Sequence, residues 1–120
     1  MAYNDFAEMP VWQLGDQIVA EIYKLTEALP KREDYALCSQ LRDAAVSITG
    51  NIAEGFGRGH VKDKINFYYY SRGSAHEVRS HLFSGKTAGY FNLEQIHPIQ
   101  LKCLQVIEGL NKIIKGLSSP

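Results

Sequence analysis

The sequence lacks the features that mark membrane, secreted and disulfide-stabilised proteins. Its two cysteines, Cys38 and Cys103, are too few for a disulfide framework, and we expect both to be reduced core residues. No apolar run approaches the roughly 20 residues that span a bilayer. The first ten residues, MAYNDFAEMP, contain acids and lack the basic start and apolar block of a signal peptide. We therefore expect a cytoplasmic protein without a membrane partner.

The chain also lacks net charge, because 13 Lys/Arg offset 13 Asp/Glu. This balance argues against strong nonspecific binding of polyanions. The charges are nevertheless unevenly distributed. Residues 1–60 hold five basic and nine acidic side chains, a balance of −4, whereas residues 61–120 hold eight and four, a balance of +4. One face of the folded protein is therefore expected to be basic.

Strand signals are scarce, since no alternation is sustained and no Asn-Gly or Asp-Gly hairpin occurs. Apolar residues instead recur at intervals of three and four, which predicts helices over about 10–29, 34–56, 63–87 and 93–116. Pro10 suits the first turn of a helix, and Pro30 stops that helix. At 120 residues, the chain is predicted to form one domain, 1–120, with an all-α, antiparallel up-down-up-down four-helix bundle.

Local signals refine the helix ends. We predict Asp63 as the N-cap of the third helix, Gly89 as its C-terminal cap, and Asn92 with Gln95 as a capping box for the fourth. Pro98 is expected to bend the fourth helix or delay its start. Each helix is predicted to bury one stripe of side chains in the core. In the first helix these are Trp12, Val19, Ile22, Tyr23, Leu25 and Leu29, and in the second Leu37, Leu41, Ala44, Ala45, Ile48 and Ile52. In the third they are Tyr68, Ser71, Ala75, Val78 and Leu82, and in the fourth Ile96, Ile99, Cys103, Val106, Ile107, Leu110, Ile113, Ile114 and Leu117.

The glycine-rich segment GNIAEGFGRG, residues 50–59, has to be distinguished from a phosphate-binding loop. Gly50 and Gly55 have the spacing of a P-loop, but Phe56 and Gly57 follow in place of Lys and Ser/Thr. A helix also precedes these glycines, where a P-loop requires a strand. The segment is therefore predicted to be a helix end, and we expect no cofactor.

Other catalytic patterns are also missing. His76 and His81 are five residues apart, which turns them away from each other on a helix, and no clustered Cys/His spacing occurs. Gly73-Ser74 is not a nucleophile elbow. We expect no metal site and no enzymatic activity.

The polar side of the second helix allows three interpretations. Asn51, Glu54 and Arg58 lie at i, i+3 and i+7, so that an amide, a carboxylate and a guanidinium share one face. Glu54 as a catalytic acid or base lacks a second carboxylate, histidine or metal nearby in sequence. A solvated Glu54–Arg58 pair is the second interpretation. The third, a structural corner or a subunit interface, is implied by the family resemblance described below.

The segment from Arg58 to Lys86 is basic and aromatic, with six Lys/Arg, three histidines and two acids. On a helix, one face would carry Tyr69, Arg72, His76, Arg79, Phe83 and Lys86. Arginines bind phosphates and tyrosines stack on unpaired bases, so this face is a candidate nucleic-acid site. Packing against a neighbouring subunit, with the charges at the rim, is the alternative.

The run YALCSQLRDAAVSITGNIAEGFGR, residues 35–58, resembles the signature of the four-helix-bundle family named for proteins encoded in intervening sequences of bacterial 23S rRNA genes. Members of that family look like Y-L-QLRRAAVSI-NIAEG-GR through this region. VWQLGDQIVAEIYKLTEALP, residues 11–30, is similar to the family's first helix, and Phe67-Tyr68, Gly73-Ser74, Glu77 and Gly89-Tyr90 are similar to its third helix and following turn. The resemblance covers roughly residues 9–117.

The resemblance implies a four-helix protomer that assembles as a ring-like homopentamer, and no enzymatic activity is established for this branch. A related branch, the accessory protein of diversity-generating retroelements, associates with reverse transcriptase and nucleic acid. The implied partners are therefore copies of this chain and, by analogy, RNA, DNA or a reverse transcriptase. Asn51, Glu54, Gly55 and Arg58 then belong to a family motif that holds an interface or a helix corner.

The third helix departs from the family pattern. It reads RGSAHEVRSHLFSGK, residues 72–86, where many members read roughly LGSLSELETQLLLA. Arg72, His76, Arg79, His81 and Lys86 add basic character there. We expect a non-enzymatic, oligomeric assembly or interaction module; the alternative is an RNA- or DNA-binding ring that uses this helix.

Overall fold

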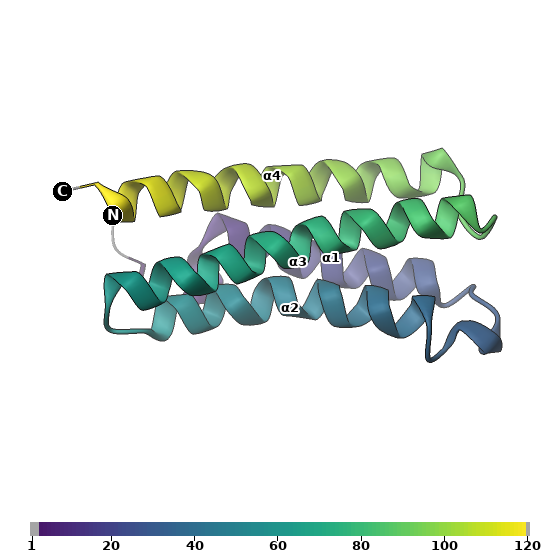
Figure 1. Ribbon diagram of the computed structural model, residues 1–120, viewed down its shortest axis with the longest axis horizontal. Coiled ribbons are helices and arrows are strands. Elements are labelled where there is room, and N and C mark those ends of the chain that lie inside the picture. The colour runs from purple at the N-terminus through teal and green to yellow at the C-terminus, as the bar shows by residue number, and fades with distance from the viewer. Residues whose placement is uncertain (1–2, 120) are drawn as a thin grey trace.

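The computed structural model describes residues 3–119 and places four long helices side by side (Figure 1). These are α1 (Pro10–Thr26), α2 (Leu37–Gly57), α3 (Val61–Thr87) and α4 (Leu93–Ser118), with short 3₁₀ turns η1 (Phe6–Glu8) and η2 (Lys31–Glu33). No strand occurs within the described residues. The predicted all-α fold is confirmed.

Each helix packs against its two neighbours around the bundle. α1 contacts α2 and α4, and α3 contacts α2 and α4. The molecule measures 48 × 22 × 20 Å, and both chain ends lie at the same end of its long axis (Figure 1). The α1–α2 pair therefore forms one side of the bundle and the α3–α4 pair the opposite side.

The ends of α1 and α2 differ from the prediction. α1 begins at Pro10 as expected but ends at Thr26, three residues early, because the Leu29 amide donates to the Thr26 carbonyl in a turn that leads into Pro30. α2 begins at Leu37, three residues late, after the η2 turn. Glu33 still serves the start of α2, because its carboxylate accepts from the Leu37 amide at 3.3 Å.

The start of α3 also corrects the prediction. The helix begins at Val61, two residues early, and His60 occupies the N-cap position without a side-chain cap bond. Asp63 is therefore not the N-cap. It lies in the first turn, where a carboxylate still favours the positive end of the helix dipole.

The loop between α3 and α4 follows its local signals. Gly89 has a φ of +87°, the left-handed conformation that favours glycine. The Asn92 side chain accepts from the Gln95 amide at 2.9 Å, and the Gln95 side chain accepts from the Asn92 amide at 2.8 Å, so the capping box is confirmed. The expected delay at Pro98 is wrong, since α4 runs from Leu93 through Pro98. The helical hydrogen bond that Pro98 cannot donate would have reached the carbonyl of Glu94, and Glu94 is an exposed residue in the first turn of α4.

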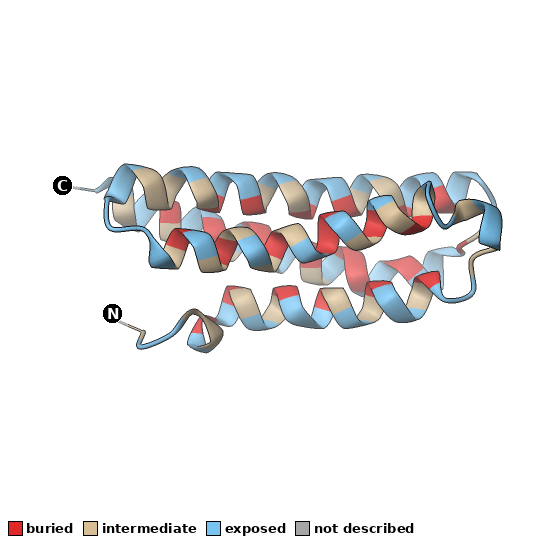
Figure 2. Ribbon diagram, turned by 90° about the horizontal axis from the view of Figure 1, so that it is seen from below, coloured by how far each residue is buried: buried red, intermediate tan, exposed pale blue. Residues whose placement is uncertain are grey.

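Buried residues line the inner side of each helix (Figure 2). The predicted stripes of α2 and α3 are buried, except that Leu37 is half-buried, and both cysteines are buried and free. The stripe of α1 is partly wrong: Val11, Gly15, Ile18, Ile22 and Thr26 are buried, whereas Tyr23 is exposed. In the described residues, no helix is long and apolar enough to cross a membrane.

Candidate functional site

The family motif lies at the corner where α2 ends and α3 begins. Gly55 is buried against the ring of Tyr68, and a Cβ atom at residue 55 would lie 2.8 Å from Tyr68 Cε1. Tyr68 is itself buried, and this burial raises the pKa of its hydroxyl above the ordinary value of 10.0. A glycine is therefore required at residue 55 by the close approach of the tyrosine ring.

Lys64 closes the same corner. Its ammonium group donates to the carbonyls of Phe56 at 2.8 Å and Gly55 at 3.3 Å. These carbonyls belong to the last turn of α2, where a cation is favoured by the helix dipole, and the Gly55 carbonyl also accepts from the Arg58 amide at 3.3 Å. Lys64 thus holds the start of α3 on the end of α2.

The polar side chains of the motif have separate partners. Arg58 pairs with Glu54 at 3.2 Å, with both side chains about half exposed, and its guanidinium lies 4.6 Å from the centre of the Phe67 ring. Asn51 donates to the Ser47 carbonyl of its own helix at 2.9 Å. The structure therefore brings Glu54 and Arg58 together but leaves Asn51 bonded to backbone.

We expect Gly55→Ala to lower the free energy of unfolding by about 1–3 kcal/mol, because the added methyl group overpacks the corner. Gly50→Ala is the matched control in the same helix, since nothing lies within 4 Å of its Cβ position. That control should raise stability by up to about 1 kcal/mol through helix propensity. Urea unfolding followed by circular dichroism measures both. Equal stability of the two variants would contradict the packing argument.

Two of the predicted basic residues of α3, Arg72 and Arg79, form hydrogen bonds with α4. Arg72 donates to the Asn111 side chain at 2.9 Å and lies 4.6 Å from the centre of the Tyr69 ring. Arg79 donates from Nε to Gln100 Oε1 at 3.1 Å, and Gln100 Nε2 donates back to the Arg79 carbonyl at 3.1 Å. Both arginines therefore join the two helices and are half-buried.

Large apolar side chains surround these arginines. Tyr69 and Phe83 on α3 are 43% and 47% exposed, and Leu93 and Leu104 on α4 are 59% and 42% exposed. We call the surface formed by Tyr69, Arg72, His76, Arg79, Phe83, Lys86, Leu93 and Leu104 the α3–α4 face. His76, Arg79 and Phe83 line an open hollow of about 560 Å³ on it. The face is thus apolar at many points and basic at others.

The residues that α4 contributes to the α3–α4 face were not identified from the sequence. Leu93, Gln100, Leu104 and Asn111 follow one another at steps of seven, four and seven, which places them on one edge of a helix. That periodicity was available in the sequence. Its meaning depended on knowing that this edge borders α3.

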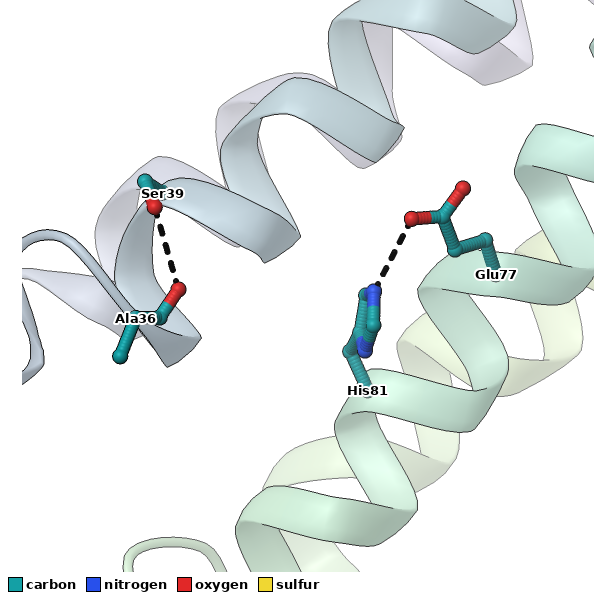
Figure 3. Close-up of polar contacts among 4 residues, drawn as sticks. All are labelled: Ala36, Ser39, Glu77 and His81. Atoms are coloured by element: carbon teal, nitrogen blue, oxygen red, sulfur yellow. Dashed lines mark hydrogen bonds and ion pairs between the residues drawn. The ribbon is translucent and has the colours of Figure 1, made fainter.

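The histidines of α3 lie on different sides of the helix. His76 Nδ1 is 3.4 Å from Arg79 on the α4 side, whereas His81 Nε2 is 3.1 Å from Glu77. Figure 3 shows Glu77 and His81 on α3 with Ser39, at the start of α2, opposite them. Residues 3–119 contain no group of three or more His, Cys, Asp or Glu that would hold a metal ion.

Comparisons with known proteins agree with this architecture. A family model described as 23S rRNA-intervening sequence protein matches residues 7–112. A crystal structure of a protein of unknown function from the S23 ribosomal protein family, from Bacteroides thetaiotaomicron, is similar over 88% of this chain and 95% of that chain. The TM-score is 0.81 and the sequence identity is 23%, which supports a shared fold. No curated protein matches the chain.

Proposed function

The chain belongs to the family of 23S rRNA-intervening sequence proteins, and we propose that it is a non-enzymatic assembly module that binds copies of itself through the α3–α4 face. The observation that carries this proposal is the group of exposed apolar side chains on that face: Tyr69, Phe83, Leu93 and Leu104. Exposed aromatic and leucine side chains that surround arginines are typical of protein–protein interfaces.

The distribution of charge supports a head-to-tail contact. The half of the chain with a balance of −4 forms α1 and α2, and the half with +4 forms α3 and α4, on the opposite side of the bundle. The basic side of one copy therefore complements the acidic side of the next. Contacts between two different faces generate a closed ring when the rotation closes.

The acidic side offers a matching surface. Tyr23 and Val46 are 42% and 46% exposed there, and they line a hollow of about 550 Å³ together with Asp43, Asn51 and Glu54. Two polar residues of the family motif thus lie where the second half of a head-to-tail interface would form. We infer from this arrangement that the motif takes part in assembly, and the family resemblance suggests five copies in the ring.

We expect light scattering to give a mass near five times 13.5 kDa for the wild-type protein and near one chain for Leu104→Glu. Leu104 is exposed, so the charge should leave the protomer folded while opposing the acidic side of the next copy. Tyr35→Glu is the matched control, because Tyr35 is 97% exposed and lies outside both faces. A wild-type mass of one or two chains would overturn the ring, and an unchanged mass for Leu104→Glu would overturn this face.

Nucleic acid is the second candidate partner of the α3–α4 face. Tyr69 presents a ring beside the Arg72 guanidinium, and His76 and Lys86 are exposed. A ring would repeat this group in every copy and strengthen weak binding. Salt-dependent binding of single-stranded RNA that is lost in Arg72→Gln/Arg79→Gln would favour this alternative. No binding at low salt would reject it.

A further inference from the structure

A hollow of about 560 Å³ lies at the end of the bundle where the chain begins and ends. Its lining residues belong neither to the α3–α4 face nor to the hollow lined by Tyr23 and Val46. It lies where α1 begins and where α2 and α4 end, at the end marked N and C in Figure 1. Its apolar lining is supplied by Met9, Val11, Phe56, Ile113 and Leu117. This volume falls within the range of about 300–1,000 Å³ typical of small-molecule sites.

Gly109 forms a close contact between α1 and α4 at the edge of this hollow. A Cβ atom at residue 109 would lie 2.5 Å from Val11 Cγ1, so α1 and α4 approach each other closely at this glycine. Gly109 also lines the hollow. The absence of a side chain at Gly109 lets Val11 of α1 pack directly against the α4 backbone at the edge of the hollow.

Two polar side chains converge on the hollow from α3. Lys64 and Tyr68 both line it and are four residues apart, which places them on the same face of the helix. Lys64 donates to two carbonyls, and an ammonium group has three donors. Within residues 3–119 the Tyr68 hydroxyl forms no hydrogen bond. Because every fully buried polar side-chain atom among these residues has a partner, the Tyr68 hydroxyl is not fully buried. Because Tyr68 lines the hollow, we take its hydroxyl to be accessible from it.

The charge of the site is positive. None of the lining residues is acidic, and Lys64 is the one lining residue with a formal charge. An anionic group near Lys64 would gain a charge-assisted hydrogen bond from the ammonium and a second bond from the tyrosine hydroxyl. The surrounding apolar side chains exclude a highly polar ligand and favour a hydrocarbon tail.

We propose that this hollow binds a small apolar monocarboxylate, such as a medium-chain fatty acid. The carboxylate accepts hydrogen bonds from Lys64 Nζ and the Tyr68 hydroxyl, and the tail lies against Met9, Val11 and Ile113. The site is independent of the assembly proposed above, because its lining residues come from the end of the bundle.

Calorimetric titration with octanoate tests the proposal, with 1-octanol as a neutral probe of the same length. We expect octanoate to bind the wild-type protein, and Lys64→Met to weaken it at least about tenfold while leaving 1-octanol unchanged. Lys112→Met is the matched control, because Lys112 is an exposed lysine of α4. It should bind octanoate like the wild type.

Two further variants separate binding from folding, since Lys64 also holds the α2–α3 corner. Tyr68→Phe keeps the ring against Gly55 and removes the hydroxyl, so octanoate should bind several-fold more weakly at unchanged stability. Ile113→Trp fills the hollow and should abolish binding of both probes. Absence of octanoate binding up to about 5 mM would overturn the proposal. Equal weakening of both probes by Lys64→Met would overturn the role of the charge.

Discussion

Replacing Gly85 with alanine is expected to lower the free energy of unfolding by about 1–3 kcal/mol or more, although alanine is the better helix former. The added Cβ would lie 2.3 Å from Phe91 Cε2 and 2.4 Å from Phe91 Cδ2. Phe91 is buried and lies in the short loop between α3 and α4, so its ring packs against the end of α3. The Gly85 carbonyl also accepts from the Tyr90 amide at 2.9 Å. This bond holds the loop that carries Phe91 against the end of α3.

The matched control is Gly73→Ala, which lies in the same helix. Gly73 is exposed and nothing lies within 4 Å of its Cβ position, so this variant should gain up to about 1 kcal/mol. Urea unfolding of both variants gives the comparison. Phe91→Leu introduced into Gly85→Ala should recover part of the loss, because a smaller side chain makes room for the methyl group. If Gly85→Ala is as stable as Gly73→Ala, the contact with Phe91 does not limit this position.

The second large effect is a loss of stability at alkaline pH that depends on Cys103. Burial raises the pKa of the Cys103 thiol from 9.0 to about 12, while nearby Arg79 lowers it and Glu21 raises it to a smaller extent. Between these pH values the thiol is ionised in the unfolded chain and protonated in the folded protein. The folded state then holds one more proton than the unfolded state, so stability falls as pH rises.

We expect this linkage to remove about 3 kcal/mol of stability at pH 11 relative to pH 8. Cys103→Ala should lose some stability at every pH because of the cavity, but its stability should decline less between pH 8 and pH 11. Cys38→Ala is the control, since it removes a buried thiol of α2 and retains Cys103. Urea unfolding at several pH values measures the slopes. The same alkaline slope in both variants would show that Cys103 does not titrate differently on folding.

The number and type of the helices followed from the sequence because the signals are local and periodic. Pro10, Gly89 and the Asn92–Gln95 pair act on backbone groups within a few residues, so they marked helix ends correctly. The boundaries around Pro30 were less predictable. An additional 3₁₀ turn takes up three residues there, and Glu33 serves α2 from outside the helix through a side-chain bond to Leu37.

The candidate sites were predicted in part. The sequence placed Arg72 and Arg79 on one face with Tyr69, and it placed Glu54 near Arg58. It did not indicate that the arginines bond to Asn111 and Gln100. These partners are 39 and 21 residues away, and the contact depends on which edge of α4 borders α3.

The sequence by itself determined an all-α chain of four amphipathic helices, its family and the opposite charge of its two halves, because composition, periodicity and motif text are properties of the chain alone. The tertiary structure decided which glycines of the segment 50–59 are needed for packing, and which groups the polar side chains bond to. Gly55 is needed because Tyr68, thirteen residues later, packs on it, whereas Gly50 faces open space. Such differences arise from helix rotation and interhelical distance, which only the packed bundle sets.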